Sequence, residues 1–449
     1  MSKRKGSKVA RLPVVEANAA GVDIGATEVF VAVPADRDPQ PIRCFATFTA
    51  DLQRLADWLE QCQIRTVAME STGVYWIALF QILEERKIEA CLVNAQHLKN
   101  VPGRKTDVED CQWIQHLHSV GLLRGSFRPN QEICAIRSLW RHRDNLIQLA
   151  TVHLQHMQKA LDQMNLQIHH VISDLAGRTG LAIVDAILAG ERDVQKLAQL
   201  RDWRIRASEE TIMKSLVGDY REEHLFTLRQ SLESYRHYQR LIQEVDTQVK
   251  QMMRQLSGRV DITAKALPPE KNPRKTPWRN EPPQLREDLY RAFGVDLTQI
   301  PGINTLTAQM LLTEVGPDLS RFPTVAAFCS WLRSGTENQW WQGTLVEDSS
   351  QQNRAALSLR MAAQGLHRSQ TFLGDYFRRM KSRLGTPKAL TAAAHKLARI
   401  VYHMVTRRQE YDATVFQELE RRVQDRKRMK LRIQARELGF DLVARAAVA

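Results

Sequence analysis

The sequence predicts a mixed α/β domain at the N-terminal end, followed by regions that are almost entirely helical. Between residues 18 and 125, short apolar runs alternate with amphipathic segments. Beyond residue 130, long stretches rich in Arg, Gln, His and Leu have few helix breakers. The fold class is therefore α/β followed by α. The chain of 449 residues is long enough for two to four domains.

The α/β region contains strands and helices in a recognisable order. The predicted elements are strands over 19–25, 27–34 and 41–48, a helix over 51–63, a strand over 65–70, a helix over 74–87, a strand over 88–94 and a helix after residue 106. The first two strands are joined by a Gly-Ala turn, which predicts a hairpin. This is the element order of an RNase H-like (RuvC-like) domain, which we place at residues 18–125.

Four acidic residues fall where this fold brings element ends together. Asp23 lies in the first strand between small neighbours, and Glu70 ends a buried strand. Asp107 and Asp110 follow Thr106, a fair N-cap, and their spacing puts them on one face of a helix. Four carboxylates at one edge would repel one another without divalent cations. We therefore predict a two-metal site for phosphodiester chemistry, with Mg²⁺ as the ion and Mn²⁺ as the alternative.

Each of these acids also has a simpler interpretation. A single Asp or Glu at such a position is commonly a surface residue or a helix cap. Asp107 in particular could act only as a first-turn partner of the helix dipole. The prediction of a metal site depends on the four residues occurring together.

Composition points to a nucleic-acid partner. Lys and Arg total 64 against 50 Asp and Glu, a net charge of +14. Such a surplus favours a polyanion, with a well-solvated basic protein as the alternative. The six cysteines contain no C-x-x-C pair, which indicates a reducing cytoplasm. The basic N-terminus has no apolar segment behind it, and no apolar run approaches the roughly 20 residues that span a membrane.

Changes in composition divide the rest of the chain. We expect long paired helices, plausible as a dimerising or nucleic-acid-holding coiled coil, before a segment that contains six prolines between residues 267 and 283. The tail is a basic helix that either follows a phosphate backbone or is simply solvated. The predicted regions are a basic arm at 1–17, the α/β domain at 18–125, a helical coiled-coil region at 126–257, a Pro-rich linker at 258–285, a small helical domain at 286–412 and a basic helical tail at 413–449.

Several basic or turn-forming residues are predicted to contact phosphates. Residues 297–316 resemble a helix-hairpin-helix, in which Pro301 and Gly302 form a tight turn before a helix start. An ordinary turn between two packed helices is the competing interpretation. Arg104 and Lys105, just before the acidic pair, and Arg354 are the other expected contacts.

The whole chain resembles transposases of the insertion sequence 110 family, in the subgroup of insertion sequence 1111, with the Piv DNA invertase as a more distant relative. The segments that carry the resemblance are AAGVDIGATE, ADRDPQPIRCF, AMESTGVYWI, LVNAQHLKNVPGRKTDVEDCQW, HLQHMQKALDQMN, LAGERD, REEHLFTLRQ and TAAAHKLARIVYHM. The resemblance assigns the family's DEDD tetrad to Asp23, Glu70, Asp107 and Asp110. It also identifies residues 286–412 as a C-terminal transposase domain.

The resemblance carries further expectations about activity and partners. It implies an enzyme that excises and inserts a mobile element without ordinary RNase H-type hydrolysis, using a C-terminal serine that becomes covalently linked to DNA. It implies a structured bridge RNA that guides the choice of DNA, and a homo-oligomer, either a dimer or a tetramer.

The segment expected to hold the serine departs from the family pattern. The family has Ser-Gly-Gly-Lys followed by several arginines. This chain has Gln339 at the serine position, and Glu347 and Asp348 at positions where the family has arginines. Gln cannot act as a phosphodiester nucleophile. Ser334 is a substitute by residue type, but it aligns with the family's Pro-Gly.

A compensated frameshift explains the departure. Reading residues 337–342 one base forward gives Lys-Ile-Ser-Gly-Gly-Lys when Gln339 is encoded by CAG, and the single Trp codon nearly forces both glycines. Continuing the shifted reading restores the basic run. A divergent but active loop is the alternative.

Two rival functions remain at this stage. An RNase H-like Holliday-junction resolvase or nuclease would use the same tetrad but would need neither the C-terminal domain nor a serine. A non-catalytic nucleic-acid-binding remnant of a transposase would explain Gln339.

Overall fold

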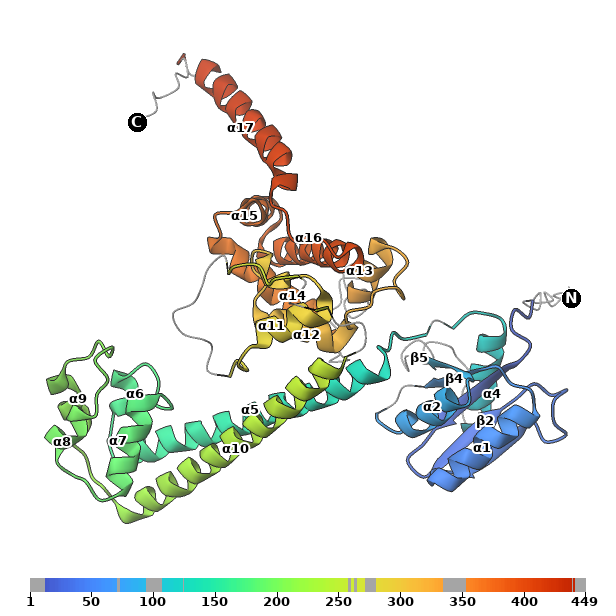
Figure 1. Cartoon of the computed structure of the whole chain (residues 1–449), viewed down its shortest axis with the longest axis horizontal. Helices are drawn as coiled ribbons and strands as arrows, with labels where there is room; N and C mark the ends of the chain where they lie inside the picture. The colour runs from blue at the N-terminus through green and yellow to red at the C-terminus, as the bar shows by residue number, and fades with distance from the viewer. Residues whose placement is uncertain are drawn as a thin grey trace, which may run out of the picture. The chain divides into compact units, whose positions relative to one another are not determined.

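The computed structural model describes residues 13–70, 73–93, 107–123, 125–256, 260–261, 265–270, 280–333, 353–437 and 439–440. The chain divides into two compact units, Met1–Arg128 and Pro129–Ala449 (Figure 1). The predicted change from an α/β region to a mostly helical one is confirmed. Residues 1–12, which carry most of the expected basic arm, lie outside the described part.

The first unit is a five-stranded sheet covered by helices, with the elements in the predicted order. These are β1 (Ala19–Ile24), β2 (Glu28–Ala32), β3 (Ile42–Ala46), α1 (Thr49–Gln61), β4 (Thr66–Glu70), α2 (Trp76–Glu85), β5 (Glu89–Val93) and α4 (Asp107–Ser119). The strand order is β3-β2-β1-β4-β5. The predicted hairpin is present as the antiparallel β1–β2 pair, while β4 runs parallel to both β1 and β5. This arrangement is consistent with an RNase H-like domain.

The two faces of the sheet are covered by different helices. Val22, Val67 and Met69 lie in one core cluster with the apolar residues of α1 and α2. Ala68 and Val93 lie in a second cluster with Ile114 and Leu117 of α4. Because alternate side chains of a strand point to opposite faces, residues of β1 and β4 can be assigned to the α1/α2 face or to the α4 face.

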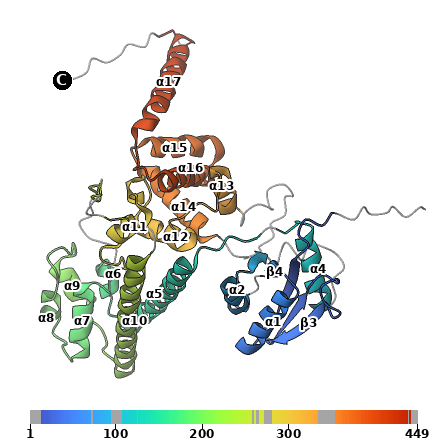
Figure 2. The same ribbon diagram turned by 45° about the vertical axis from the view of Figure 1, so that its right-hand side comes forward.

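In the described residues of the second unit, every regular element is a helix (Figures 1 and 2). Its N-terminal helices are α5 (Gln131–Gln163), α6 (Ile168–Val171), α7 (Arg178–Leu188), α8 (Val194–Gln199), α9 (Glu209–Ser215) and α10 (Glu222–Gln255). Its C-terminal helices are α11 (Leu285–Phe293), η1 (Leu297–Gln299), α12 (Thr305–Val315), α13 (Val325–Arg333), α14 (Arg354–Gly365), η2 (Leu366–Arg368), α15 (Phe372–Leu384), α16 (Thr386–Arg407), η3 (Thr414–Phe416) and α17 (Gln417–Glu437).

The two longest helices, α5 and α10, form an antiparallel pair within the chain, with α6–α9 at its far end (Figure 1). Arg143 of α5 pairs with Asp246 of α10, whereas His153, further along α5, stacks on Tyr238, which is earlier in α10. Buried residues of α5 recur three or four positions apart, as in the run Ile133, Ile136, Trp140 and Arg143. Apolar residues of both helices, such as Leu146 of α5 and Ile242 of α10, lie in one core cluster, so the two helices bury apolar side chains against each other.

A buried ion pair, which the sequence analysis did not predict, joins these two helices. The side chain of Arg143 is 2% exposed, and its guanidinium donates to both carboxylate oxygens of Asp246 and to the carbonyl of Asn280. It also lies over the Trp140 ring. Since a buried charge is costly without partners, replacing Asp246 by an uncharged residue would leave the Arg143 guanidinium without its ionic partner.

Candidate active site

Two of the predicted acidic residues lie side by side at the carboxyl ends of β1 and β4. Val22 pairs with Met69 in the parallel β1–β4 ladder, so Asp23 and Glu70 are the next residues along the two strands. Val22 and Met69 belong to the α1/α2 core, and Ala68 belongs to the α4 core. Alternation along each strand therefore puts Asp23 and Glu70 on the α4 face. Both side chains are partly exposed.

A glycine allows α4 to approach that face closely. A Cβ at Gly21 would lie 2.2 Å from the backbone nitrogen of Gln115 and 2.4 Å from the carbonyl oxygen of Cys111. The helix backbone thus occupies the space that any other side chain would need. Gln115 also donates from Nε2 to the carbonyl of Ala19, at 3.2 Å. These contacts hold the first turns of α4 against β1, two residues from Asp23.

Asp23 and Asp110 both lie close enough to the Cys111 thiol to affect its pKa. Burial, and to a smaller extent the nearby negative charges of Asp23 and Asp110, together raise the pKa of the Cys111 thiol to about 12. The thiol is completely buried and is protonated at neutral pH, so it is neither a nucleophile nor a thiolate ligand. Asp23 from β1 and Asp110 from α4 therefore share one electrostatic environment.

The far end of α4 is also fixed to the sheet. The ring Nε2 of His118 lies 2.9 Å from the hydroxyl of Thr66, the first residue of β4. Burial lowers the pKa of His118. The carbonyl of Ser119 accepts hydrogen bonds from the backbone of Val15 and Glu16. With its middle and its C-terminal end held, α4 has a defined position over β1 and β4.

Replacing Gly21 by Ala is expected to destabilise the first unit by at least about 1–3 kcal/mol, the usual range for overpacking a tight site. The added methyl group meets helix backbone, which cannot rotate away. Thermal unfolding followed by circular dichroism measures the change. Gly365→Ala is the matched control, because nothing lies within 4 Å of a Cβ there. Equal unfolding temperatures for the two variants would contradict the close approach of α4 to β1.

Part of the predicted site lies outside the described residues. Asp107 is the first residue of α4, three positions before Asp110, but its side chain is not described. Arg104 and Lys105 precede the described part of this segment, and Ser334 and Gln339 fall within 334–352, which is also outside it. The structure places Asp23 and Glu70 at adjacent strand ends and Asp110 near Asp23 around the Cys111 thiol. A metal site shared by these carboxylates, and the roles of the other five residues, remain predictions.

Of the predicted phosphate contacts, Pro301, Gly302 and Arg354 are described. Pro301 lies in the turn before α12, and Gly302 and Arg354 make contacts within the protein. Gly302 has a φ of +92°, in the left-handed region, and a Cβ there would lie 2.6 Å from the carbonyl of Ala362 in α14. The next helix, α12, is capped by Asn304, whose side chain accepts from Thr307. Arg354 begins α14 and pairs with Asp144 of α5 at 3.2 Å.

Two family models match this chain. Residues 20–166 match a DEDD transposase model of the IS110 family, described as "Transposase", and residues 296–335 match "Transposase IS116/IS110/IS902 family". The chain belongs to the IS110 family of transposases. The predicted family is confirmed, and with it the expectation of an enzyme that acts on DNA. No curated protein matches the chain.

In this transposase, the first match covers the sheet from the second residue of β1, together with α4 and all of α5, and the second covers η1, α12 and α13. Across the described residues, none of the helices combines the length and apolar character needed to cross a membrane. Gly21 is a site residue that the sequence analysis missed. The available signal was a glycine inside an apolar strand, which often marks a close approach of another backbone.

Proposed function

We propose that this transposase holds divalent cations, Mg²⁺ or Mn²⁺, with Asp23, Glu70, Asp107 and Asp110. The main support is the convergence of Asp23, Glu70 and Asp110 on the α4 face of the sheet. The donor set fits the ion, because Mg²⁺ and Mn²⁺ prefer carboxylate oxygens. When bound, the cations would neutralise the carboxylates and polarise a phosphodiester of DNA.

The protein's own residues fix the positions of the carboxylates. Asp23 and Glu70 are on adjacent strands of the sheet. Asp110 is on α4, whose backbone can lie directly against β1 because Gly21 has no side chain. Sites built on strands and helices are held more precisely than sites on loops. This rigidity favours a role in orienting a DNA phosphate for strand transfer.

A metal titration tests this proposal. Asp110→Asn and Asp107→Asn should each weaken Mn²⁺ binding by about tenfold or more, since each removes a charged oxygen ligand. Binding can be followed by the loss of the free Mn²⁺ paramagnetic resonance signal. Asp36→Asn is the control, because its side chain is 76% exposed and pairs only with the neighbouring Arg37 in the described structure. If the Asp107 and Asp110 variants both bound Mn²⁺ as tightly as the unmodified chain, these two residues would not be metal ligands.

The proposal extends to partners. The family gives DNA as a partner, and we further infer a structured guide RNA and a homo-oligomer, as the sequence resemblance implies. The net charge of +14 supports binding dominated by phosphates. In α17, Arg421, Arg426, Arg428 and Arg432 are exposed along one basic helix that is available to a phosphate backbone.

Affinity for DNA or structured RNA should fall steeply as salt increases. Each neutralised phosphate releases counterion, so about six to ten contacts would reduce affinity by about 10³–10⁵-fold between low and physiological ionic strength. Fluorescence anisotropy with a labelled duplex measures this. Replacing Arg426 and Arg428 by Gln should reduce the slope of log affinity against log salt by about 1–2. A flat dependence for the unmodified chain would refute binding through phosphates.

The segment around Gln339 supports a second proposal about this copy. With Gln in place of the family's serine, and with Glu347 and Asp348 where arginines are expected, the chain would bind DNA and metal without completing strand exchange. The match over residues 296–335 favours a transposase over a junction resolvase, which would need no such domain.

A further inference from the structure

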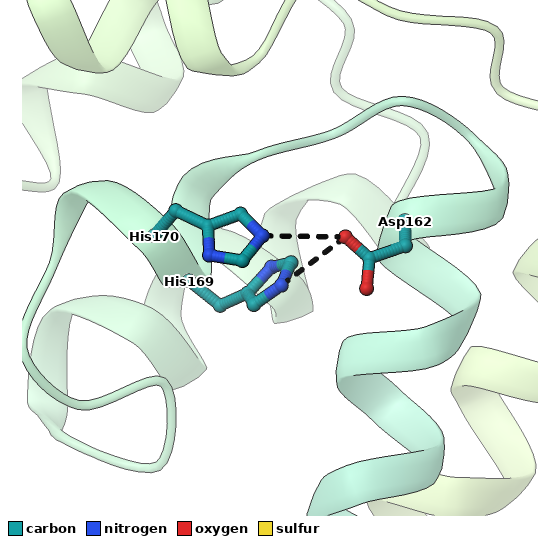
Figure 3. Close-up of side chains that lie close together, drawn as sticks. All are labelled: Asp162, His169 and His170. Atoms are coloured by element: carbon teal, nitrogen blue, oxygen red, sulfur yellow. Dashed lines mark ion pairs between the residues drawn. The ribbon is translucent and has the colours of Figure 1, made fainter.

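We propose a zinc-binding site formed by Asp162, His169 and His170 at the far end of the α5–α10 pair (Figure 3). One carboxylate oxygen and the two imidazole nitrogens all lie within 4.8 Å of one another. The site is separate from the predicted tetrad, since its ligands are in the second unit of the chain. Its donor set also differs, because imidazole suits Zn²⁺ while an all-carboxylate set suits Mg²⁺.

The distances fit a single central ion. The Oδ1 atom of Asp162 lies 3.2 Å from Nε2 of His169 and 3.6 Å from Nε2 of His170. Two zinc bonds of about 2.1 Å at a tetrahedral angle place their ligand atoms about 3.4 Å apart. Figure 3 shows both rings directed at the same carboxylate oxygen. Two of the three ligand-to-ligand distances thus match those around one zinc ion, and the third, between the two imidazole nitrogens, is within 4.8 Å.

A tight helix end holds the ligands in place. Asp162 is in the last turn of α5, and Asn165, with a φ of +52°, reverses the chain so that α6 returns beside it. The backbone nitrogens of Asn165 and Leu166 bond back to the carbonyls of Asp162 and Leu161. Asn is among the few residues other than Gly that adopt this conformation readily.

Packing keeps this turn rigid. Leu166 and Ile168 are fully buried in the core of the helical unit, on either side of the exposed Gln167. The backbone of Gln167 donates to the carbonyl of Ser215, and the backbone of Asp219 donates to that of Met164. His169 and His170 therefore project from a backbone fixed on two sides.

The local electrostatics also favour a cation. The C-terminal end of a helix carries a partial negative charge, and a carboxylate placed there adds to it. The last turn of α5 contains Asp162 and no basic residue. A bound Zn²⁺ would neutralise both the carboxylate and the helix end.

The exposure of the ligands predicts an open coordination position. His169 is 6% exposed, whereas Asp162 and His170 are 52% and 66% exposed. Three protein ligands with an accessible fourth position is the pattern of non-structural zinc sites, where water completes the shell. The buried Nδ1 of His169 has no hydrogen-bond partner among the described residues. A hydrogen bond to the second ring nitrogen strengthens a histidine as a zinc ligand. We therefore expect the zinc affinity to be about 10–100-fold lower than at a site where each histidine makes this bond.

The test is a Zn²⁺ titration of the untagged full-length chain against a chromophoric chelator, with Mg²⁺ in excess to occupy carboxylate sites. One zinc ion per chain is expected. His170→Ala and Asp162→Asn should each weaken binding by about 100-fold or more, since each removes a direct ligand. His237→Ala is the control, because this exposed histidine pairs only with Arg240 and Tyr238 in the described structure.

Two further measurements make the outcome decisive. Asp23→Asn should retain the zinc ion, which separates this site from the tetrad. Bound Co²⁺ should give the visible absorption of a four-coordinate site with nitrogen and oxygen ligands. His170→Ala should abolish this absorption. Failure of the unmodified chain to bind zinc, or unchanged binding in both ligand variants, would overturn the proposal and leave a histidine–aspartate ion pair. His170 is exposed, so its replacement is compatible with folding.

Discussion

Strand exchange is expected to appear when residues 333–352 are replaced by their frame-restored reading, which changes Gln339→Ser and returns the basic run. The physical reason is that carboxylates and cations can orient a phosphodiester, but an amide at position 339 cannot become covalently joined to it. The measurement is recombination between two marked plasmids in the presence of the element's own RNA and Mg²⁺. The unmodified chain should give no recombinants and should still bind DNA.

The control for this experiment is the same restored segment with alanine at position 339. It keeps the glycines and arginines but lacks the hydroxyl, so it should be as inactive as the unmodified chain. Equal recombination by the unmodified and restored chains would show that the chemistry does not need that serine. Ser334 would then be the first alternative to replace.

In the restored chain, Asp23→Asn is expected to reduce strand exchange by about 10³-fold or more while DNA binding and folding are retained. Asp23 lies beside Glu70 on the sheet and shares the surroundings of Cys111 with Asp110, so its loss removes a charge from the centre of the predicted site. Metal-assisted stabilisation of a reacting phosphate contributes several kcal/mol, and each 1.36 kcal/mol is tenfold in rate.

Asp36→Asn in the restored chain is the matched comparison, since this exposed carboxylate belongs to the same domain. It should recombine DNA at the same rate as the restored chain that carries no further substitution. If Asp23→Asn also retained full activity, the tetrad would not take part in the chemistry, and the role of the first unit would be limited to holding DNA.

The helices and strands whose formation depends on a local residue pattern could be predicted from the sequence. Alternating and helical apolar periods gave the order of strands and helices in the first unit, and the position of Asp23 and Glu70 at strand ends followed from that order. These features depend on a few neighbouring residues. The family was likewise predictable from contiguous motifs.

The features that were missed depend on how the folded chain brings residues together, either from distant segments or across a sharp turn. The need for glycine at position 21 becomes evident only when α4 is known to cross β1 and to leave no space for a side chain. The buried pair of Arg143 and Asp246 joins residues 103 positions apart, and an arginine in an apolar seam gives no sign of its partner. The cluster of Asp162, His169 and His170 depends on the sharp reversal at Asn165.

The most direct test of the central claim is a crystal structure of the full chain with Mn²⁺ and a DNA substrate, using the anomalous scattering of manganese to locate the ions. We predict manganese peaks between the ends of β1 and β4 and the start of α4, with carboxylate oxygens of Asp23, Glu70, Asp107 and Asp110 as ligands at about 2.0–2.2 Å. Carboxyl groups of these residues more than about 10 Å apart, with no manganese between them, would contradict a shared two-metal site.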